Sequence, residues 1–257
     1  MPPLELEGPE QMALDGWLLD QSVAGRLVTP LLRVYTWPGA WLSLGHHQQT
    51  LPGCWRSLEQ AGLVQAGLVQ RVRRPSGGGA VLHAGGLTYA LIWPHAPRSR
   101  REAYQSTSTW LIEAFARLGV ELQPGTGTAE AGQSNCFASS TPADLLDQEG
   151  HKRIGSAQFW RRGHLLQHGE ILIRPPCTLW KNLFNTDPPP AWDRIDQEAI
   201  IAALQSSLRT LWPGRAWQPF VLSDEEWDQI KARKGLYDLS LAPSSLSSPE
   251  ACIDATA

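Results

Sequence analysis

The amino-acid sequence predicts an α+β fold, in which a mixed and largely antiparallel sheet is flanked by helices. Two observations lead to this fold class. Segments rich in strand-forming residues come in adjacent pairs, and stretches with helical periodicity separate the pairs. The alternation of strands and helices is also too irregular for a doubly wound parallel sheet.

The first part of the chain should form a helix followed by two strands. Residues 10–20 form the helix, because apolar side chains recur at helical spacing there, at Met12, Ala13, Trp17 and Leu18. Residues 31–38 are rich in strand-forming side chains and end at Pro38. Residues 41–48 should form a short strand that runs into a polar loop.

A short duplication comes next. Residues 61–70 repeat the pentapeptide AGLVQ, which is far too short a period for a repeat fold, so we expect it to join a helix end to a strand start. Residues 67–76 should form a strand that enters a glycine turn. Residues 80–94 have the pattern of a hairpin, with a tight connection at residues 84–86.

A helix and a long loop follow. Apolar side chains keep helical spacing over residues 101–118, and Gly119 should end that helix. Residues 123–143 are rich in Gly, Ser, Thr, Ala and Pro and predict a long loop. Long loops inside compact domains are often functional.

A second hairpin and another helix complete the pattern. Residues 151–160 and 164–175 should pair through a turn at residues 161–163. Residues 195–212 carry an apolar face typical of a helix, made of Ile200, Ala203, Leu204, Leu208 and Leu211.

The C-terminal part predicts one more helix and a tail. Residues 223–226, Ser-Asp-Glu-Glu, have the capping-box pattern, which should open a helix through Ile230. No linker pattern divides the chain, so we predict one domain over residues 1–239, of which 195–239 are a helical C-terminal part. Residues 240–257 have the composition of a disordered tail.

Composition excludes several classes of protein. The net charge of −3 indicates neither nucleic acid nor a membrane as partner. No apolar run approaches the ~18 residues of a membrane span, and the N-terminus lacks the basic and apolar segments of a signal peptide. We therefore expect a cytoplasmic protein, and we assume that it is a monomer. The four cysteines form no C-x-x-C pair, so we predict neither a metal site nor a disulfide framework.

The segment from Arg73 to His83 is the most informative for function. Gly77, Gly78 and Gly79 let a ligand approach the backbone, whose N–H groups can cradle an anion or a thioester carbonyl. Three glycines alone would equally suit a flexible turn. The two arginines before them and the histidine after them favour a binding site.

This segment resembles the signature of lipoate-protein ligases and octanoyltransferases, R-R-x-[ST]-G-G-G-A-V-x-H-D. Four further segments match the family in order, namely MALD (12–15), LRVYTW with SLGHHQ (32–48), HKRIGSAQ (151–158) and LLQHGEILI (165–173). The resemblance covers about residues 10–175. It implies the fold of the catalytic domain that these enzymes share with biotin ligases.

The chain departs from this pattern at two positions. Gly16 and Ala84 stand where the family often has an acidic residue. The lost carboxylate at position 84 should change how His83 is oriented.

The resemblance implies a set of residues around the acyl group: Arg73, Arg74, Ser76, Gly77, Gly78, Gly79, His83, Gly155, Ser156, Ala157 and His168. His168 could equally satisfy a hydrogen bond in the core. The resemblance also makes Lys152 the group that contacts the acyl carbonyl or an acyl-adenylate phosphate, and an ammonium there stabilises a developing oxyanion. From its pattern alone, Lys152 would be an exposed loop lysine.

Cys136 distinguishes between branches of the family. Its segment, Ser134-Asn135-Cys136-Phe137, resembles that of cysteine-dependent octanoyl-acyl carrier protein:protein octanoyltransferases, in which the cysteine carries the acyl group. A thiol suits a thioester substrate, because the exchange is nearly thermoneutral and needs no adenylation. The alternative is a small buried side chain, which a Gly- and Ser-rich loop disfavours.

Three functions therefore remain open. The first is transfer of an octanoyl or lipoyl group, without cofactor, from acyl carrier protein through Cys136 to a lysine of a lipoyl-carrier domain. The second is an ATP-dependent lipoate ligase that needs Mg²⁺. The third is a non-catalytic binder, against which the presence of His83 and Lys152 counts. Basic side chains that could dock an acidic carrier protein, or be solvated surface charges, are Arg98, Arg100, Arg101, Arg161 and Arg162.

Overall fold

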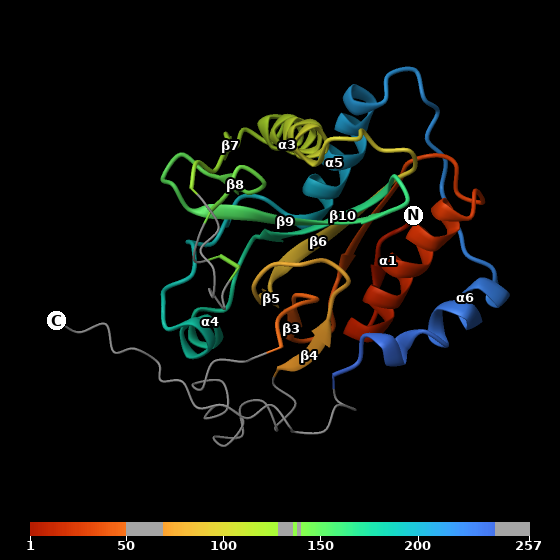
Figure 1. Ribbon diagram of the computed structural model, residues 1–257. Coiled ribbons are helices and arrows are strands. Elements are labelled where there is room, and N and C mark those ends of the chain that lie inside the picture. Colours follow the sequence, from red (N-terminus) through yellow and green to blue (C-terminus); the bar gives the residue numbers. More distant parts are fainter. Residues whose placement is uncertain (50–68, 128–135, 138–139, 240–257) are drawn as a thin grey trace.

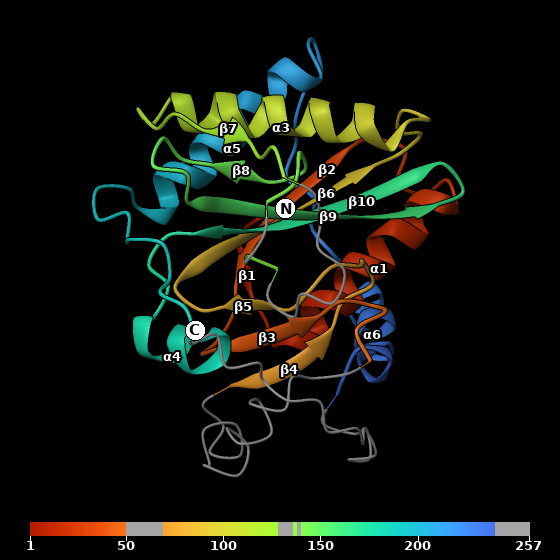
Figure 2. The same ribbon diagram turned by 60° about the vertical axis from the view of Figure 1, so that its left-hand side comes forward.

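The computed structural model describes residues 1–49, 69–127, 136–137 and 140–239. The first AGLVQ copy with the start of the second (61–68), part of the predicted 123–143 loop and the predicted tail lie outside these residues. Figures 1 and 2 show a long sheet through the middle of the molecule, with helices on both faces and a smaller sheet beside it.

The long sheet has seven strands in the order β1-β2-β6-β10-β9-β8-β7. Its strands are β1 (Leu4–Glu5), β2 (Leu31–Thr36), β6 (Gly86–Trp93), β7 (Gln123–Pro124), β8 (Leu145–Leu146), β9 (Lys152–Arg161) and β10 (His164–Leu172). β1 and β2 are parallel, and the other neighbours are antiparallel. The predicted α+β class, with a mixed and largely antiparallel sheet, is confirmed.

The second sheet has three strands in the order β4-β3-β5, with β3 at Trp41–Leu44, β4 at Gln70–Arg73 and β5 at Val81–His83. The predicted hairpin over residues 80–94 is wrong, because β5 pairs with β3 whereas β6 pairs with β2 and β10. Gly85, with a φ of +68°, leads the chain from one sheet to the other. Its carbonyl oxygen accepts a hydrogen bond from the Arg174 N–H at 2.8 Å, and a Cβ on Gly85 would collide with the Arg174 backbone. Strand propensity and turn residues do not say which partner a strand finds.

Helices cover both faces of the long sheet. α3 (Arg100–Ala116) and α5 (Gln197–Leu211) pack on one face, and α1 (Gly8–Val23) with α6 (Asp224–Lys231) on the other. α4 (Cys177–Phe184) packs on the small sheet, and a 3-10 turn, η1 (Lys234–Leu236), lies against α1. The predicted capping box is present, since Ser223 and Glu226 exchange their hydrogen bonds. Within the described ranges, no helix combines the length and apolar character that crossing a bilayer requires.

The predicted hairpin of β9 and β10 is confirmed, and its register positions the site. Gly155 pairs with Glu170 and Ala157 with His168. Because successive side chains alternate between faces, these four residues share the face that looks toward α1 and the small sheet. The turn residues Arg162 and Gly163 both have positive φ, as a tight connection requires.

Candidate active site

The glycine loop, residues 76–79, is held by the buried guanidinium of Arg74. Nη2 of Arg74 donates to the carbonyl oxygens of Gly77 and Gly79, at 2.7 Å each, and Nη1 donates to the Ser43 carbonyl oxygen at 2.8 Å. A trans peptide directs its N–H opposite to its C=O, so the Gly78 N–H points away from Arg74. Gly78 has a φ of +96°, which a residue with a side chain rarely adopts.

Arg73 holds the neighbouring loop in place. Its Nη1 donates to the carbonyl oxygens of Gly45 and Gln48, at 2.9 Å each. Gly45 in turn lies directly against the carbonyl oxygen of Gly78, where a side chain would collide. The guanidinium groups of both predicted arginines therefore bind main-chain carbonyl groups around the glycine loop.

Cys136 lies beside this loop. Its N–H donates to the Ala80 carbonyl oxygen at 2.9 Å, and a Cβ on Gly78 would stand 3.9 Å from its Sγ. Lys152, the first residue of β9, donates from Nζ to the Cys136 carbonyl oxygen at 2.5 Å and lies 4.0 Å from Sγ. Burial lowers the pKa of Arg74, while the negative charge of the Cys136 thiolate acts in the opposite direction. The predicted nucleophile, lysine and glycine loop are thus brought together.

Asp144 holds Lys152 in this position. Its Oδ1 lies 3.1 Å from Lys152 Nζ, and its Oδ2 accepts hydrogen bonds from the main-chain N–H and hydroxyl of Thr141, at 2.8 and 3.0 Å. The residue is buried. A carboxylate fixed in this way keeps the ammonium next to Cys136. Asp144 is not among the predicted site residues, because nothing in its local sequence pattern indicates a contact with β9.

His83 connects the two sheets. Its Nδ1 lies 2.7 Å from Oε2 of Glu170, its Nε2 lies 2.8 Å from the Ser43 hydroxyl, and its ring stacks on Trp37 at 4.2 Å between centroids. Glu170 therefore supplies the carboxylate that Ala84 does not. Both ring nitrogens of this buried histidine contact protein groups, so its role in the site is structural support.

Ser76 and His168 meet under the glycine loop. The Ser76 hydroxyl lies 2.5 Å from His168 Nε2, and His168 Nδ1 lies 3.0 Å from the Asp15 carboxylate. The structure thus brings the two predicted residues Ser76 and His168 into contact, and Asp15 of α1 continues this chain of hydrogen bonds. Asp15 belongs to the motif MALD, whose sequence pattern by itself indicates no chemistry.

The three predicted residues of β9 divide between the two faces of the sheet. Gly155 faces the site, where a Cβ would stand 3.2 Å from both Lys152 and Phe137. Ala157 also faces the site, paired with His168. The Ser156 hydroxyl bonds to Tyr89 at 2.8 Å, on the face covered by α3. Ser156 therefore lies apart from the other predicted site residues.

A model of the lipoyl protein ligase A/B catalytic domain matches residues 7–191. The chain belongs to this family. The predicted kinship with lipoate-protein ligases and octanoyltransferases, and with it the prediction of an enzyme, is confirmed.

Several relatives of this lipoyl protein ligase A/B family member are octanoyltransferases. Octanoyltransferase LipM of Lysinibacillus sphaericus is 31% identical, over 86% of this chain and 88% of the relative. LipM of Geobacillus kaustophilus is 30% identical, over 93% and 86%. The match to LipM of Brevibacillus brevis is 37% identical but covers 63% of this chain and 60% of that relative.

Solved structures agree on the family fold. A putative lipoate protein ligase of T. acidophilum with bound lipoic acid superposes with a TM-score of 0.69 at 16% identity, over 90% of this chain and 92% of that one. Lipoate-protein ligase A bound with ATP gives 0.68 at 16% identity, over the same fractions. These matches establish the architecture alone.

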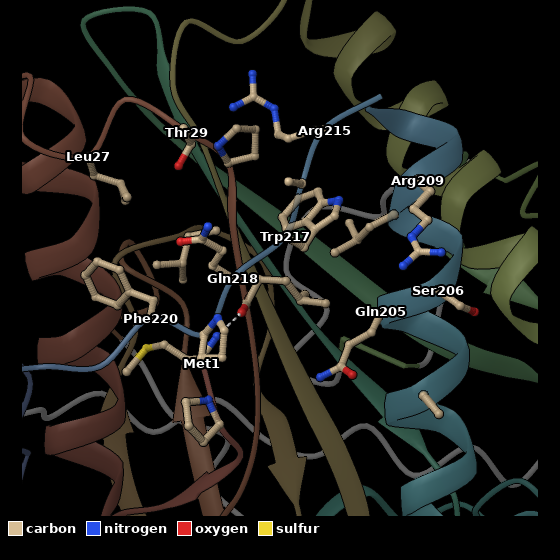
Figure 3. A pocket seen from close by; sticks show the side chains of 18 residues that line it. Met1, Leu27, Thr29, Gln205, Ser206, Arg209, Arg215, Trp217, Gln218 and Phe220 are labelled. Atoms are coloured by element: carbon tan, nitrogen blue, oxygen red, sulfur yellow. Dashed lines mark hydrogen bonds between the residues drawn. The ribbon is translucent and has the colours of Figure 1, made fainter. Parts of the chain in front are cut away.

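Two other features of this family member lie away from Cys136. Arg161 is at the far end of β9, roughly 30 Å from Lys152 at the usual rise per residue, and it bonds to Asp20. A groove of about 800 Å³ runs between the N-terminus, β2 and α5, lined among others by Met1, Trp217 and Phe220 (Figure 3). None of the predicted site residues lines it.

Proposed function

We propose that this chain transfers an octanoyl group from acyl carrier protein to a lysine of a lipoyl-carrier domain, through a thioester on Cys136. The observation that supports this most is the cluster of Cys136, Lys152 and the glycine loop. Its relatives named octanoyltransferase LipM support the same acyl group.

In the first half-reaction, the Cys136 thiolate attacks the thioester carbonyl of the donor. A carbon–sulfur bond to Cys136 forms, the bond to the carrier thiol breaks, and the carrier leaves as a thiolate that takes a proton from solvent. The developing oxyanion needs donors. The Lys152 ammonium lies 4.0 Å from Sγ, and the N–H of Gly78, on the loop beside Cys136, is the second candidate. Neither ATP nor a metal takes part in this exchange.

In the second half-reaction, the amine of the acceptor lysine attacks the octanoyl-cysteine. A carbon–nitrogen bond forms, the carbon–sulfur bond breaks, and Cys136 returns as a thiolate. The same two donors serve this second oxyanion. Asp144 keeps Lys152 at the cysteine throughout.

One comparison of two reactions tests the proposal. The purified chain is incubated with an apo lipoyl domain and octanoyl-acyl carrier protein in EDTA without ATP, and separately with free lipoate, ATP and Mg²⁺. We expect modification of the acceptor in the first reaction and none in the second. The reverse result would identify a ligase, with the glycine loop as cradle of an adenylate phosphate. No modification in either reaction would identify a non-catalytic binder.

A further inference from the structure

Asp15, His168 and Ser76 form a continuous hydrogen-bonded chain that ends at the glycine loop. His168 Nδ1 lies 3.0 Å from Oδ2 of Asp15, and His168 Nε2 lies 2.5 Å from the Ser76 hydroxyl. Asp15 and Ser76 are at most 1% exposed and His168 is 5% exposed. A hydroxyl, an imidazole and a carboxylate in this order are the arrangement that moves a proton onto a histidine.

The partners of Asp15 define the tautomer of His168. Burial by itself would raise the pKa of the Asp15 carboxyl, but Arg33, at 2.5 Å, and the hydrogen bond from His168 lower it below its ordinary value. An ionised carboxylate only accepts hydrogen bonds, so Nδ1 of His168 carries the hydrogen. Nε2 therefore has the lone pair and accepts from the Ser76 hydroxyl in the neutral ring.

The surroundings of His168 favour this neutral ring before the reaction. Burial lowers its pKa, and Asp15 acts in the opposite direction. The other charged or titratable groups that face it are Arg74, next to the glycine loop, and His83 of β5, and both also lower the pKa. A neutral histidine next to a fixed carboxylate can accept a proton and stabilise the resulting imidazolium.

The chain reaches the floor of the candidate active site. Ala157, half-buried, is the neighbour of His168 across the β9–β10 pair, and Gly155 is two residues before it. Gly77 follows Ser76, and a Cβ there would meet no atom within 4 Å. The relay thus ends one residue before Gly77, whose Cβ position is open.

Lys152 acts as a hydrogen-bond donor in the site. Its Nζ donates to the Cys136 carbonyl oxygen and lies 3.1 Å from the Asp144 carboxylate. The second half-reaction releases a proton, because the acceptor amine loses one when it becomes an amide.

We propose that Ser76, His168 and Asp15 are the relay that takes this proton, a statement that rests on the proposed function. As the carbon–nitrogen bond forms, the ammonium proton of the intermediate passes to Ser76 Oγ, directly or through one water. The hydroxyl proton of Ser76 passes to His168 Nε2, and Asp15 stabilises the imidazolium. The carbon–sulfur bond then breaks, Cys136 leaves as a thiolate, and the proton on His168 returns to solvent.

The first half-reaction does not need this relay, since a thiolate attacks and a thiolate leaves. The test therefore separates the two half-reactions. Octanoyl-enzyme is formed from octanoyl-acyl carrier protein, desalted, and mixed with either an apo lipoyl domain or hydroxylamine. The adduct of the weakly basic hydroxylamine is acidic enough to lose its proton directly to water, whereas the alkylammonium adduct of lysine is not. Intact-mass spectrometry follows the thioester adduct and its loss with time.

His168→Gln is the main variant, because an amide oxygen can accept the Ser76 hydroxyl hydrogen but cannot take up a proton. We expect the adduct to form, transfer to lysine to fall by roughly 10²-fold or more, and reaction with hydroxylamine to stay within about threefold. Ser76→Ala, which interrupts the path, should give the same split. His164→Gln is the matched control on the same strand, since His164 bonds to Ser22 and lies outside the site.

Three other outcomes are distinguishable. Wild-type transfer to lysine by His168→Gln, or an equal loss with both acceptors, would overturn the relay and leave His168 as a support for the loop. Loss of the adduct in His168→Gln would also overturn it. Absence of the adduct in the wild-type chain would instead count against the proposed function.

Discussion

At the scale of single residues, the site depends on fixed charges beside one thiol. Lys152 is held by Asp144 and the Cys136 carbonyl oxygen, and Arg74 is held by three carbonyl groups. A charge that is already in place needs no reorganisation when an oxyanion forms nearby. The charged side chains of the site are therefore held in place by their own hydrogen bonds and ion pairs before a substrate binds.

Cys136→Ser should abolish acyl transfer and leave the fold intact, because a hydroxyl in place of the thiol cannot exchange with a thioester at a useful rate. Incubation with octanoyl-acyl carrier protein should give one thioester adduct by intact mass in the wild-type chain and none in the variant. Cys177→Ser is the matched control, since Cys177 is an exposed free cysteine on α4. Near-normal transfer by Cys136→Ser would end the assignment of the nucleophile.

Lys152→Ala should lower the transfer rate constant by roughly 10²-fold or more, the effect of losing one oxyanion donor. The ammonium acts on the transition state, so the rate constant should fall further than the apparent affinity for the donor. Single-turnover rates at varied donor concentration measure both quantities. Lys181→Ala, an exposed lysine paired with Asp187, is the control. Weaker donor binding with an unchanged rate constant would make Lys152 a docking residue.

At the scale of elements, local signals predicted most of the fold. The cap at Ser223 and the turn at Arg162 and Gly163 each form where the sequence places them. The wrong hairpin over residues 80–94 has the same origin as the missed Asp144 contact. Both depend on pairing between segments that lie apart, for which periodicity and turn residues carry no information.

The site was predictable to a similar extent. Family motifs identified Cys136, Lys152 and the glycine loop as site residues. Their separations in the sequence alone would not have predicted that they lie side by side. The Glu170–His83 contact joins residues 87 positions apart. A carboxylate inside a buried strand is a signal that could have been found, because such a group needs a partner.

The glycine loop gives a prediction at this scale. Gly78→Ala should lower the free energy of unfolding by about 1–3 kcal/mol, because its φ of +96° strains a side chain and a Cβ would stand 2.9 Å from Arg74. Gly77→Ala meets no atom within 4 Å and should change it by less than about 0.5 kcal/mol. Urea denaturation of both variants measures the difference. Equal midpoints would mean that the loop relaxes around the added methyl group.

At the scale of the whole molecule, a set of buried polar contacts joins α1, the two sheets and the glycine loop. Asp15 connects to Arg33 and Tyr35 of β2 and to His168 of β10. His83 and Glu170 make the second connection between the sheets. Apolar clusters pack each layer, and these contacts fix how the layers are placed around the site.

The free energy of unfolding should therefore decrease in two windows as the pH is lowered. Burial holds the pKa of His168 below 6.5 in the folded protein, so as the pH drops below 6.5 the unfolded chain binds a proton that the folded chain does not, and stability is lost down to the folded pKa. The pKa of Asp15 is likewise lowered, despite burial, by Arg33 and His168. Its stabilising contribution is present above 3.8 and is lost as the pH falls through the folded value.

His168→Gln isolates the first window. The variant keeps Asp15 and also His164, whose pKa burial lowers as well, so their contributions largely cancel in the comparison. Urea midpoints measured from neutral pH to about pH 5 should fall more steeply for the wild-type chain than for the variant. Parallel curves would mean that His168 takes up protons equally in the folded and unfolded chains. In that case burial would not keep the ring neutral, and His168 would lack the unprotonated Nε2 that the relay requires.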